Sequence, residues 1–84
     1  MNSRQTKTLA SLFREPAEAN IEWNAIESLL VAVGCAIIEG RGSRVRFECD
    51  GLIVNFHRPH PGKEAKRYQV RDAREFLEKL GIRP

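Results

Sequence analysis

The 84-residue sequence predicts an α+β fold, in which a three-stranded antiparallel sheet carries helices on one face. Two observations support this prediction. Apolar residues recur at helical spacing near both ends of the chain, whereas the middle alternates apolar and polar residues with a period of two. The resulting order is helix, helix, strand, strand, strand, helix. This arrangement buries the apolar side of every element in two layers and leaves the other sheet face open to solvent or to a partner.

The first and last helices are amphipathic. Apolar residues at helical spacing predict a short helix over about residues 5–14, which Pro16 ends. Residues 69–81 repeat the pattern near the C-terminus, and Gly81 fits a helix stop. The apolar positions are Leu9, Leu12 and Phe13 in the first helix, and Val70, Ala73, Leu77 and Leu80 in the last.

A second helix is predicted over about residues 24–33, because one of its faces is continuously apolar. Asn24 with Glu27 three residues later fits a capping box, and Gly34 fits the residue that ends the helix. The apolar face consists of Trp23, Ile26, Leu29, Leu30 and Val33. We expect the tryptophan to lie in the core rather than to stack on a nucleic-acid base.

Three strands follow the second helix. Residues 35–40, CAIIEG, form a short apolar strand, and residues 44–49, RVRFEC, alternate strictly between apolar and polar. Asp50 and Gly51 then form the dipeptide most typical of a two-residue hairpin loop, and residues 52–57, LIVNFH, lead back.

A two-residue loop also predicts the register of this hairpin. The pairs facing the core are Cys49–Leu52, Phe47–Val54 and Val45–Phe56. The pairs on the open face are Glu48–Ile53, Arg46–Asn55 and Arg44–His57. Directly opposite residues have Cβ atoms about 4.5–5.5 Å apart, so Arg44 and His57 should be neighbours on the open face.

Composition narrows the class of protein. The hydrophobic content of 42% and charged content of 30% indicate a globular chain, which we expect to form one domain over residues 1–84. No apolar run is long enough to span a membrane and no signal peptide opens the chain, so a cytoplasmic location is expected. Cys35 and Cys49 have apolar neighbours and are expected to be reduced, partly buried thiols rather than a disulfide or a zinc pair.

The charges are distributed unevenly along the chain. Residues 1–39 contain three basic and five acidic residues, whereas residues 40–84 contain eleven basic and six acidic residues. The balance therefore changes from −2 to +5, which indicates a polyanionic partner for the second half. The alternative is a chance asymmetry of the kind that small soluble domains often show.

The open face has the parts that cleavage of a phosphodiester requires. Arg44 and Arg46 can bind a phosphate, and His57 on the same face can act as an acid or base, as can His60 just beyond the strand, near Lys63. RNA supplies its own nucleophile, the 2′-hydroxyl, so neither a metal nor a covalent residue is needed. A solvated basic face with two inactive loop histidines explains the same residues, and composition and spacing leave both interpretations open.

Two other segments can extend this surface. Gly42 and Ser43 belong to a turn that can present backbone N–H groups to a phosphate. Lys66 and Arg67 can begin a basic track along the last helix. The other interpretation of the basic residues further along that helix is ion pairing at i,i+4, namely Arg71–Glu75 and Arg74–Glu78.

The motifs GRGSRVRF at 40–47 and FHRPHPGKE at 56–64, followed by a helix that ends in FLEKLGI, resemble the HicA toxins of bacterial toxin–antitoxin systems. The resemblance covers residues 24–82, and residues 1–20 look like an extension, with its own short helix, found in one branch of the family. It implies a fold like the double-stranded RNA-binding domain, α-β-β-β-α. It also implies a type II toxin that is an mRNA endonuclease without a cofactor, which arrests translation until a HicB antitoxin neutralises it.

The chain departs from the family at one position. In HicA toxins the strand after Gly-Ser usually begins with a histidine regarded as catalytic, whereas this chain has Arg44. One hypothesis is that His57, opposite Arg44, supplies the imidazole, with His60 of the PHP loop as the second acid or base. The alternative is a non-catalytic RNA-binding module or an inactive toxin relative that acts through its antitoxin. A third class, an interaction domain without affinity for RNA, also stays open.

We favour the hypothesis in which RNA is cleaved. Arg44 and Arg46 then hold the scissile phosphate, His57 acts as base toward the 2′-hydroxyl, and His60 acts as acid toward the leaving oxygen. The antitoxin is expected to cover the same basic face. The residues expected to contact RNA are Arg41, Gly42, Ser43, Arg46, Lys63, Lys66 and Arg67.

Overall fold

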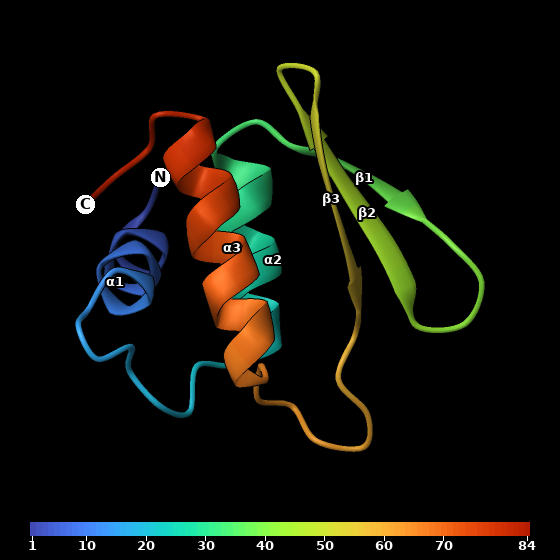
Figure 1. Ribbon diagram of the computed structural model, residues 1–84, viewed down its shortest axis with the longest axis horizontal. Coiled ribbons are helices and arrows are strands. Elements are labelled where there is room, and N and C mark those ends of the chain that lie inside the picture. The colour runs from blue at the N-terminus through green and yellow to red at the C-terminus, as the bar shows by residue number, and fades with distance from the viewer.

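The computed structural model describes all residues, 1–84, and contains three helices and one three-stranded antiparallel sheet in the order β1-β2-β3. The elements are α1 (Ser3–Leu12), α2 (Trp23–Ala32), β1 (Ala36–Glu39), β2 (Arg44–Cys49), β3 (Leu52–His57) and α3 (Arg67–Lys79). All three helices lie on one side of the sheet (Figure 1). The predicted α+β fold, with the α-β-β-β-α order of a double-stranded RNA-binding domain after α1, is confirmed.

Helix α1 packs against the other two helices rather than against the sheet, so it adds a third layer to the two that were expected (Figure 1). It begins two residues earlier than predicted, because Asn2 and Gln5 form a capping box. Leu9 and Leu12 are buried in the common core. The side chain of Gln5 also donates to the hydroxyl of Ser28 in α2, at 3.0 Å.

The predicted capping box of α2 is wrong, whereas its predicted end is confirmed. The helix begins at Trp23 without a side-chain cap, so Asn24 lies inside it. Glu27 does not turn back to the N-terminus, because its carboxylate accepts hydrogen bonds from the Trp23 indole and from Arg58. Gly34 follows the helix with a φ of 105°, a conformation that side chains other than glycine's adopt at a cost.

The register of the β2–β3 hairpin is as predicted at all six pairs, including Arg44 opposite His57. Asp50 and Gly51 form the connecting loop with φ angles of 50° and 78°, which is the two-residue turn that matches the twist of the strands. Strand β1 pairs with the other edge of β2. Both arginines of β2 therefore lie on the central strand.

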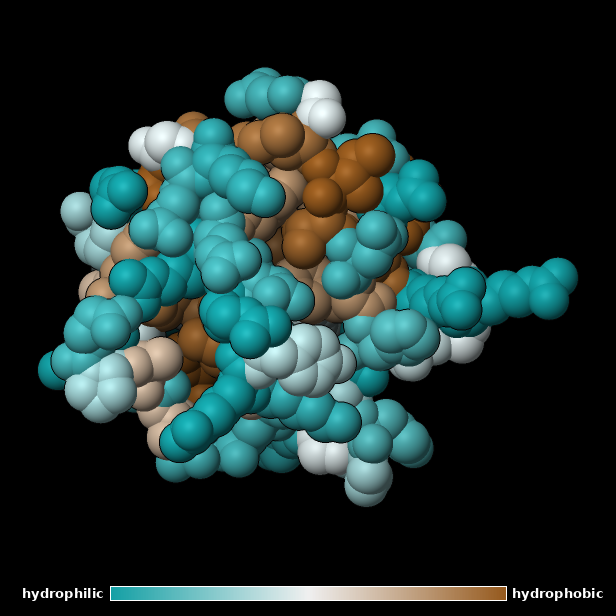
Figure 2. Space-filling view, viewed as in Figure 1, coloured by the Kyte–Doolittle hydropathy of each residue, from teal (hydrophilic) through white to brown (hydrophobic).

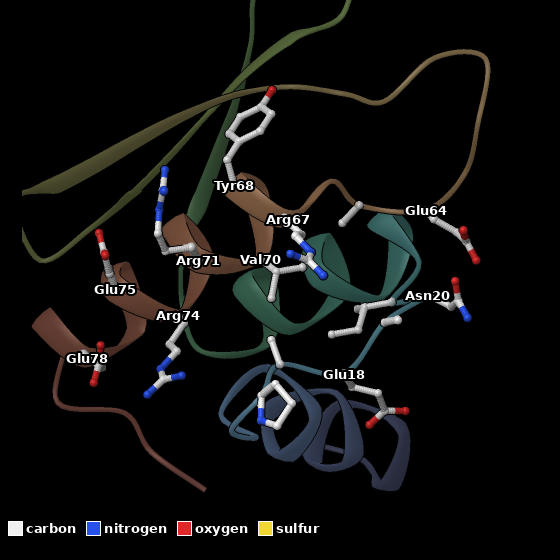
Figure 3. A pocket seen from close by; sticks show the side chains of 15 residues that line it. Glu18, Asn20, Glu64, Arg67, Tyr68, Val70, Arg71, Arg74, Glu75 and Glu78 are labelled. Carbon is white, nitrogen blue, oxygen red and sulfur yellow. The ribbon is translucent and has the colours of Figure 1, made fainter.

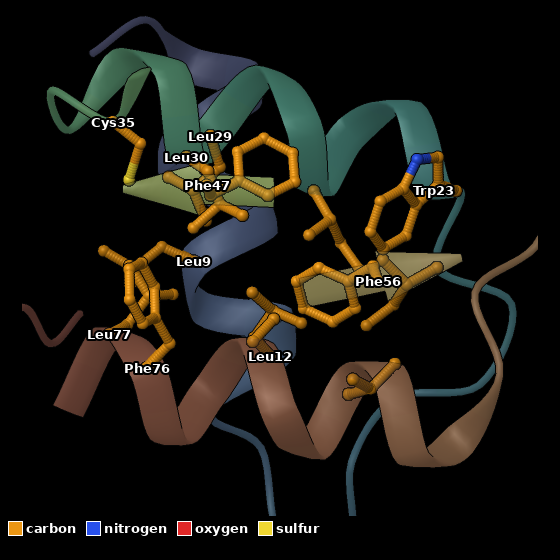
Figure 4. Close-up of a cluster of buried hydrophobic side chains, with 14 of the residues drawn as sticks. Leu9, Leu12, Trp23, Leu29, Leu30, Cys35, Phe47, Phe56, Phe76 and Leu77 are labelled. Carbon is orange, nitrogen blue, oxygen red and sulfur yellow. The ribbon is translucent and has the colours of Figure 1, made fainter. Parts of the chain in front are cut away.

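The core consists of 15 buried residues, which lie between the sheet and α2 and α3 and between these two helices and α1 (Figure 4). Trp23 packs edge-on against Phe56, with ring centroids 4.9 Å apart, and Phe56 packs against Phe47 at 6.0 Å. All three rings are buried, so the expectation that they point inward is confirmed. Cys35 and Cys49 are free thiols, buried and half-buried respectively.

Polar side chains cover most of the face seen in Figure 2, and hydrophobic surface gathers between α3 and the sheet. The hydrophilic projection at the right of that view coincides with the turn between β1 and β2. None of the helices combines the length and the apolar content that crossing a membrane requires.

Candidate nucleic-acid interface

The face of the sheet that points away from the helices is polar and basic at one end. Arg44, Arg46, Asn55 and His57 are all exposed there. Nε of Arg46 donates to Oδ1 of Asn55 at 3.4 Å, and Nη1 of Arg46 lies 3.5 Å from a carboxylate oxygen of Glu48. Glu48 therefore offsets part of the charge of Arg46, whereas Arg44 forms no ion pair with an acidic side chain.

A hollow of about 430 Å³ lies at this end of the face. Four of the predicted site residues line it, namely Arg41, Arg44, Arg46 and His57. Ile38 on β1 also lines it and is 41% exposed, so the hollow has an apolar wall beside its cationic one. The cationic side chains attract a phosphate and the apolar wall suits a flat ring, so the hollow fits a ligand that carries both.

The turn between β1 and β2 forms one rim of the hollow. Its ends are fixed, because the N–H of Gly40 donates to the carbonyl of Arg44 at 2.9 Å and the N–H of Arg44 donates to that of Arg41 at 3.1 Å. The N–H groups of Arg41, Gly42 and Ser43 have no backbone acceptor and are available to an anion. A Cβ atom at position 40 would lie 2.9 Å from that of Arg44, so glycine is needed there for the turn to close.

Arg58 connects this end of the sheet to α2. Its guanidinium donates to Glu27 on α2 at 2.6 and 3.3 Å and to Glu39 on β1 at 2.7 and 2.9 Å. These bonds raise the pKa of Arg58, and Arg58 lowers the pKa of Glu39. The N–H of Arg58 also donates to the carbonyl of Ser43 at 2.8 Å, which holds the turn to the end of β3.

Arg58 was not among the residues predicted for the site. Its two acidic partners are 31 and 19 residues away in the sequence, so no local spacing reveals the contact. Because two carboxylates bind Arg58, it does not add free positive charge to the open face.

Gln69 of α3 holds the backbone of His57. Its amide nitrogen donates to the His57 carbonyl at 2.7 Å, and its amide oxygen accepts from the N–H of Lys66 at 2.9 Å. Gln69 is 1% exposed. The position of His57 on the open face thus depends on α3 as well as on the hairpin.

A family model described as the HicA toxin of bacterial toxin-antitoxin matches residues 23–82. The chain belongs to the HicA family. It is therefore a toxin of a toxin–antitoxin system, and an antitoxin is its partner. No curated protein and no solved structure matches the chain. The match leaves α1 and the whole segment between α1 and α2 outside the family domain.

The remaining residues predicted to contact RNA in this HicA protein lie outside the hollow. His60 is exposed in the loop after β3, and the carbonyl of Lys63 accepts from the N–H of Trp23 at the start of α2. Lys66 is the N-cap residue of α3, but its side chain makes no capping hydrogen bond. Arg67 lines a second hollow, of about 800 Å³, between residues 16–21 and α3 (Figure 3).

The predicted i,i+4 ion pairs of α3 are wrong. Arg71 lies 3.4 Å from its neighbour Asp72, and Arg74 binds Glu15 of the segment after α1. The guanidinium of Arg74 also lies over the ring of Phe13, 5.4 Å from its centroid. Arg74 therefore attaches α1 to α3 and is not available to extend a basic track.

No group of three or more His, Cys, Asp or Glu side chains is arranged as metal ligands would be.

Proposed function

We propose that this HicA protein is an endoribonuclease that cleaves mRNA at the open face of its sheet and so arrests translation. The observation that carries the proposal is the direct pairing of Arg44 with His57, both exposed, beside a turn with three free N–H groups. A cation, an imidazole that can act as acid or base, and anion-binding amides are thus offered to one phosphate.

In the proposed reaction Arg44 and Arg46 bind the nonbridging oxygens of the scissile phosphate. His57 takes the proton of the 2′-hydroxyl, whose oxygen attacks phosphorus. The bond from phosphorus to the 5′ oxygen breaks, and His60 gives that oxygen a proton. The products are a 2′,3′-cyclic phosphate and a 5′-hydroxyl, and every step uses groups of the chain and of the RNA.

The basic residues outside the hollow would bind the RNA on either side of the cut. Lys63, Lys66 and Arg67 lie close together in sequence, near the N-termini of α2 and α3. The N-terminus of a helix favours an anion through its free N–H groups. We expect these residues to contribute to affinity without reading the sequence of the RNA.

The antitoxin, of the HicB type, would silence the toxin by covering the open face. An acidic surface on the antitoxin would complement Arg41, Arg44 and Arg46, and would compete with RNA for them. The expected result is that bound antitoxin abolishes both RNA binding and cleavage.

The test is incubation of the purified, antitoxin-free protein with end-labelled RNA in EDTA. The protein should cleave, and His57→Ala and His60→Ala should each cleave about 10²-fold more slowly or worse, the effect of losing a general acid or base. Arg14→Ala is the matched control, because this exposed arginine pairs only with Glu18 beyond α1, and it should cleave at the full rate. Undiminished cleavage by His57→Ala would rule out the role assigned to that residue.

A second candidate function is RNA binding without cleavage. The observation in its favour is Arg44 itself, which occupies the position where the family's strand usually begins with a histidine. In that case RNA would bind with strong salt dependence and stay intact. Replacing Arg46 with alanine should then reduce the salt slope by about one unit per lost phosphate contact. Absence of any salt-dependent binding would instead favour an interaction domain without RNA affinity.

A further inference from the structure

Cys35 and Cys49 are opposite one another at the end of the sheet far from Arg44. The ladder between β1 and β2 pairs Ala36 with Glu48, so the next pair outward in an antiparallel ladder is Cys35 with Cys49. Both side chains lie on the face toward the helices, since Cys35 belongs to the buried core and Cys49 packs against it.

The hydrogen bonds show whether Cys35 and Cys49 occupy a hydrogen-bonded or a non-hydrogen-bonded position of the ladder. The N–H of Gly40 donates to the carbonyl of Arg44, so Gly40–Arg44 is a hydrogen-bonded pair. Every second pair along the ladder, Ile38–Arg46 and then Ala36–Glu48, is of the same kind. Cys35–Cys49 lies one position beyond the last pair, Ala36–Glu48, at a non-hydrogen-bonded position, where the Cα atoms of antiparallel strands are about 4.5 Å apart. Disulfides require a Cα separation of about 4.4–6.8 Å, so the pair lies within this range, at its short end.

The two thiols differ in their access to solvent. Cys35 is 7% exposed, and its N–H donates to the carbonyl of Leu30 at 3.0 Å, which fixes it to the end of α2. Burial and, after it, the nearby thiol of Cys49 together raise the pKa of Cys35 to about 12. Cys49 is only half-buried. A reagent from solution therefore reaches Cys49 first, with Cys35 held behind it.

We propose that Cys35 and Cys49 are a site of reversible oxidation, at which a low-molecular-weight disulfide such as oxidised glutathione converts the two thiols into a disulfide between β1 and β2. The inference does not depend on cleavage of RNA. It departs from the ordinary role of buried cysteines as small apolar residues, because the register places the two side chains face to face.

The reaction takes place in two exchanges. The sulfur of Cys49 loses its proton and attacks one sulfur of oxidised glutathione, whose S–S bond breaks and releases one reduced glutathione. The sulfur of Cys35 then attacks that of Cys49 in the mixed disulfide and releases the second. Two thiol hydrogens leave the protein and two reduced glutathione molecules form, so hydrogen atoms and electrons balance.

The bond would close a loop over residues 35–49, which contains β1, the turn between β1 and β2, and all of β2. It would lie on the core side, so Arg44 and Arg46 would stay exposed on the other face. Because a short Cα separation strains a disulfide and makes it easier to reduce, we expect a bond that mild thiols reverse.

The test uses the folded, full-length protein incubated with oxidised glutathione, then denatured and treated with an alkylating agent before mass measurement. The wild type should stay monomeric, weigh two hydrogen atoms less than the reduced chain and take up no label, and it should regain two labelled thiols after dithiothreitol. Cys35→Ser and Cys49→Ser are the matched variants. Each keeps a single thiol, so neither should form an internal disulfide. Two labelled thiols in the oxidised wild type, a stable glutathione adduct on it, or disulfide-linked dimers would each overturn the proposal.

Discussion

Gln69 shows how a single side chain connects the core to the candidate site. It is a buried polar residue, and both ends of its amide are hydrogen-bonded, one to the carbonyl of His57 and the other to the N–H of Lys66. A buried polar group that loses its partner costs more than the bond itself contributes. Gln69 therefore constrains the end of β3 and the start of α3 together.

Replacing Gln69 with leucine should lower the free energy of unfolding by about 2–4 kcal/mol, because two part-buried backbone groups lose their partners. Gln5→Leu is the matched control, since Gln5 caps α1 near the surface, and its loss should cost about 1 kcal/mol or less. Urea unfolding of both variants measures the difference. Equal losses in the two variants would show that Gln69 does not hold the backbone of His57 as described.

At the scale of elements, the hairpin was predictable and the helix contacts were not. Asp50-Gly51 allows one loop length, and strict alternation in β2 allows one face for each residue, so the pairing of Arg44 with His57 followed from local chemistry. The predicted local pairs of Glu27 and Arg74 do not form. Glu27 binds Arg58 and Arg74 binds Glu15, and both partners are distant in the sequence. Long-range ion pairs leave no trace in sequence spacing.

The ion pair between Arg58, the residue after β3, and Glu39 of β1 should make stability depend on pH. Arg58 lowers the pKa of Glu39 below its ordinary value of 4.5. A carboxyl whose pKa is lower in the folded state stabilises the fold above about pH 4.5, and this contribution is lost as the pH falls through the folded value. Glu39→Gln should therefore lose less stability between neutral and acidic pH than the wild type does. Parallel pH profiles of thermal unfolding would contradict this coupling.

At the scale of the whole molecule, α1 is part of the core although it lies outside the matched HicA domain. Leu9 and Leu12 lie between α2 and α3 (Figure 4), and Arg74 bonds Glu15 of the segment that follows α1. The apolar spacing of α1 predicted a helix but not its place, because spacing does not say which layer receives a helix. The third layer covers apolar surface that α2 and α3 would otherwise expose.

Leu12→Ala should destabilise the protein by about 2–5 kcal/mol, the usual cost of a cavity at a fully buried leucine. Val31→Ala on the exposed side of α2 is the control and should change stability by about 0.5 kcal/mol or less. Denaturant unfolding gives both values. If Leu12→Ala were as stable as Val31→Ala, α1 would not be packed as an integral layer.

The candidate site was predictable in part. The residues of the hairpin and the turn could be assigned to one face from their spacing, because strands alternate strictly. The positions of His60, Lys63, Lys66 and Arg67 depend on the loop between β3 and α3, whose path is fixed by contacts with the start of α2. Such contacts between distant backbones have no local signature, and Gln69 and Arg58 were missed for the same reason.

The most direct test of the account measures single-turnover RNA cleavage in EDTA by the wild type, Arg44→Ala, His57→Ala and the double variant. Because both side chains are assigned to one phosphate, each single variant should lose about 10²-fold or more in rate. The double variant should lose clearly less than the product of the two single losses, as expected for residues that act as a unit. Wild-type rates in both single variants would contradict the claim that RNA is cut at the Arg44–His57 pair.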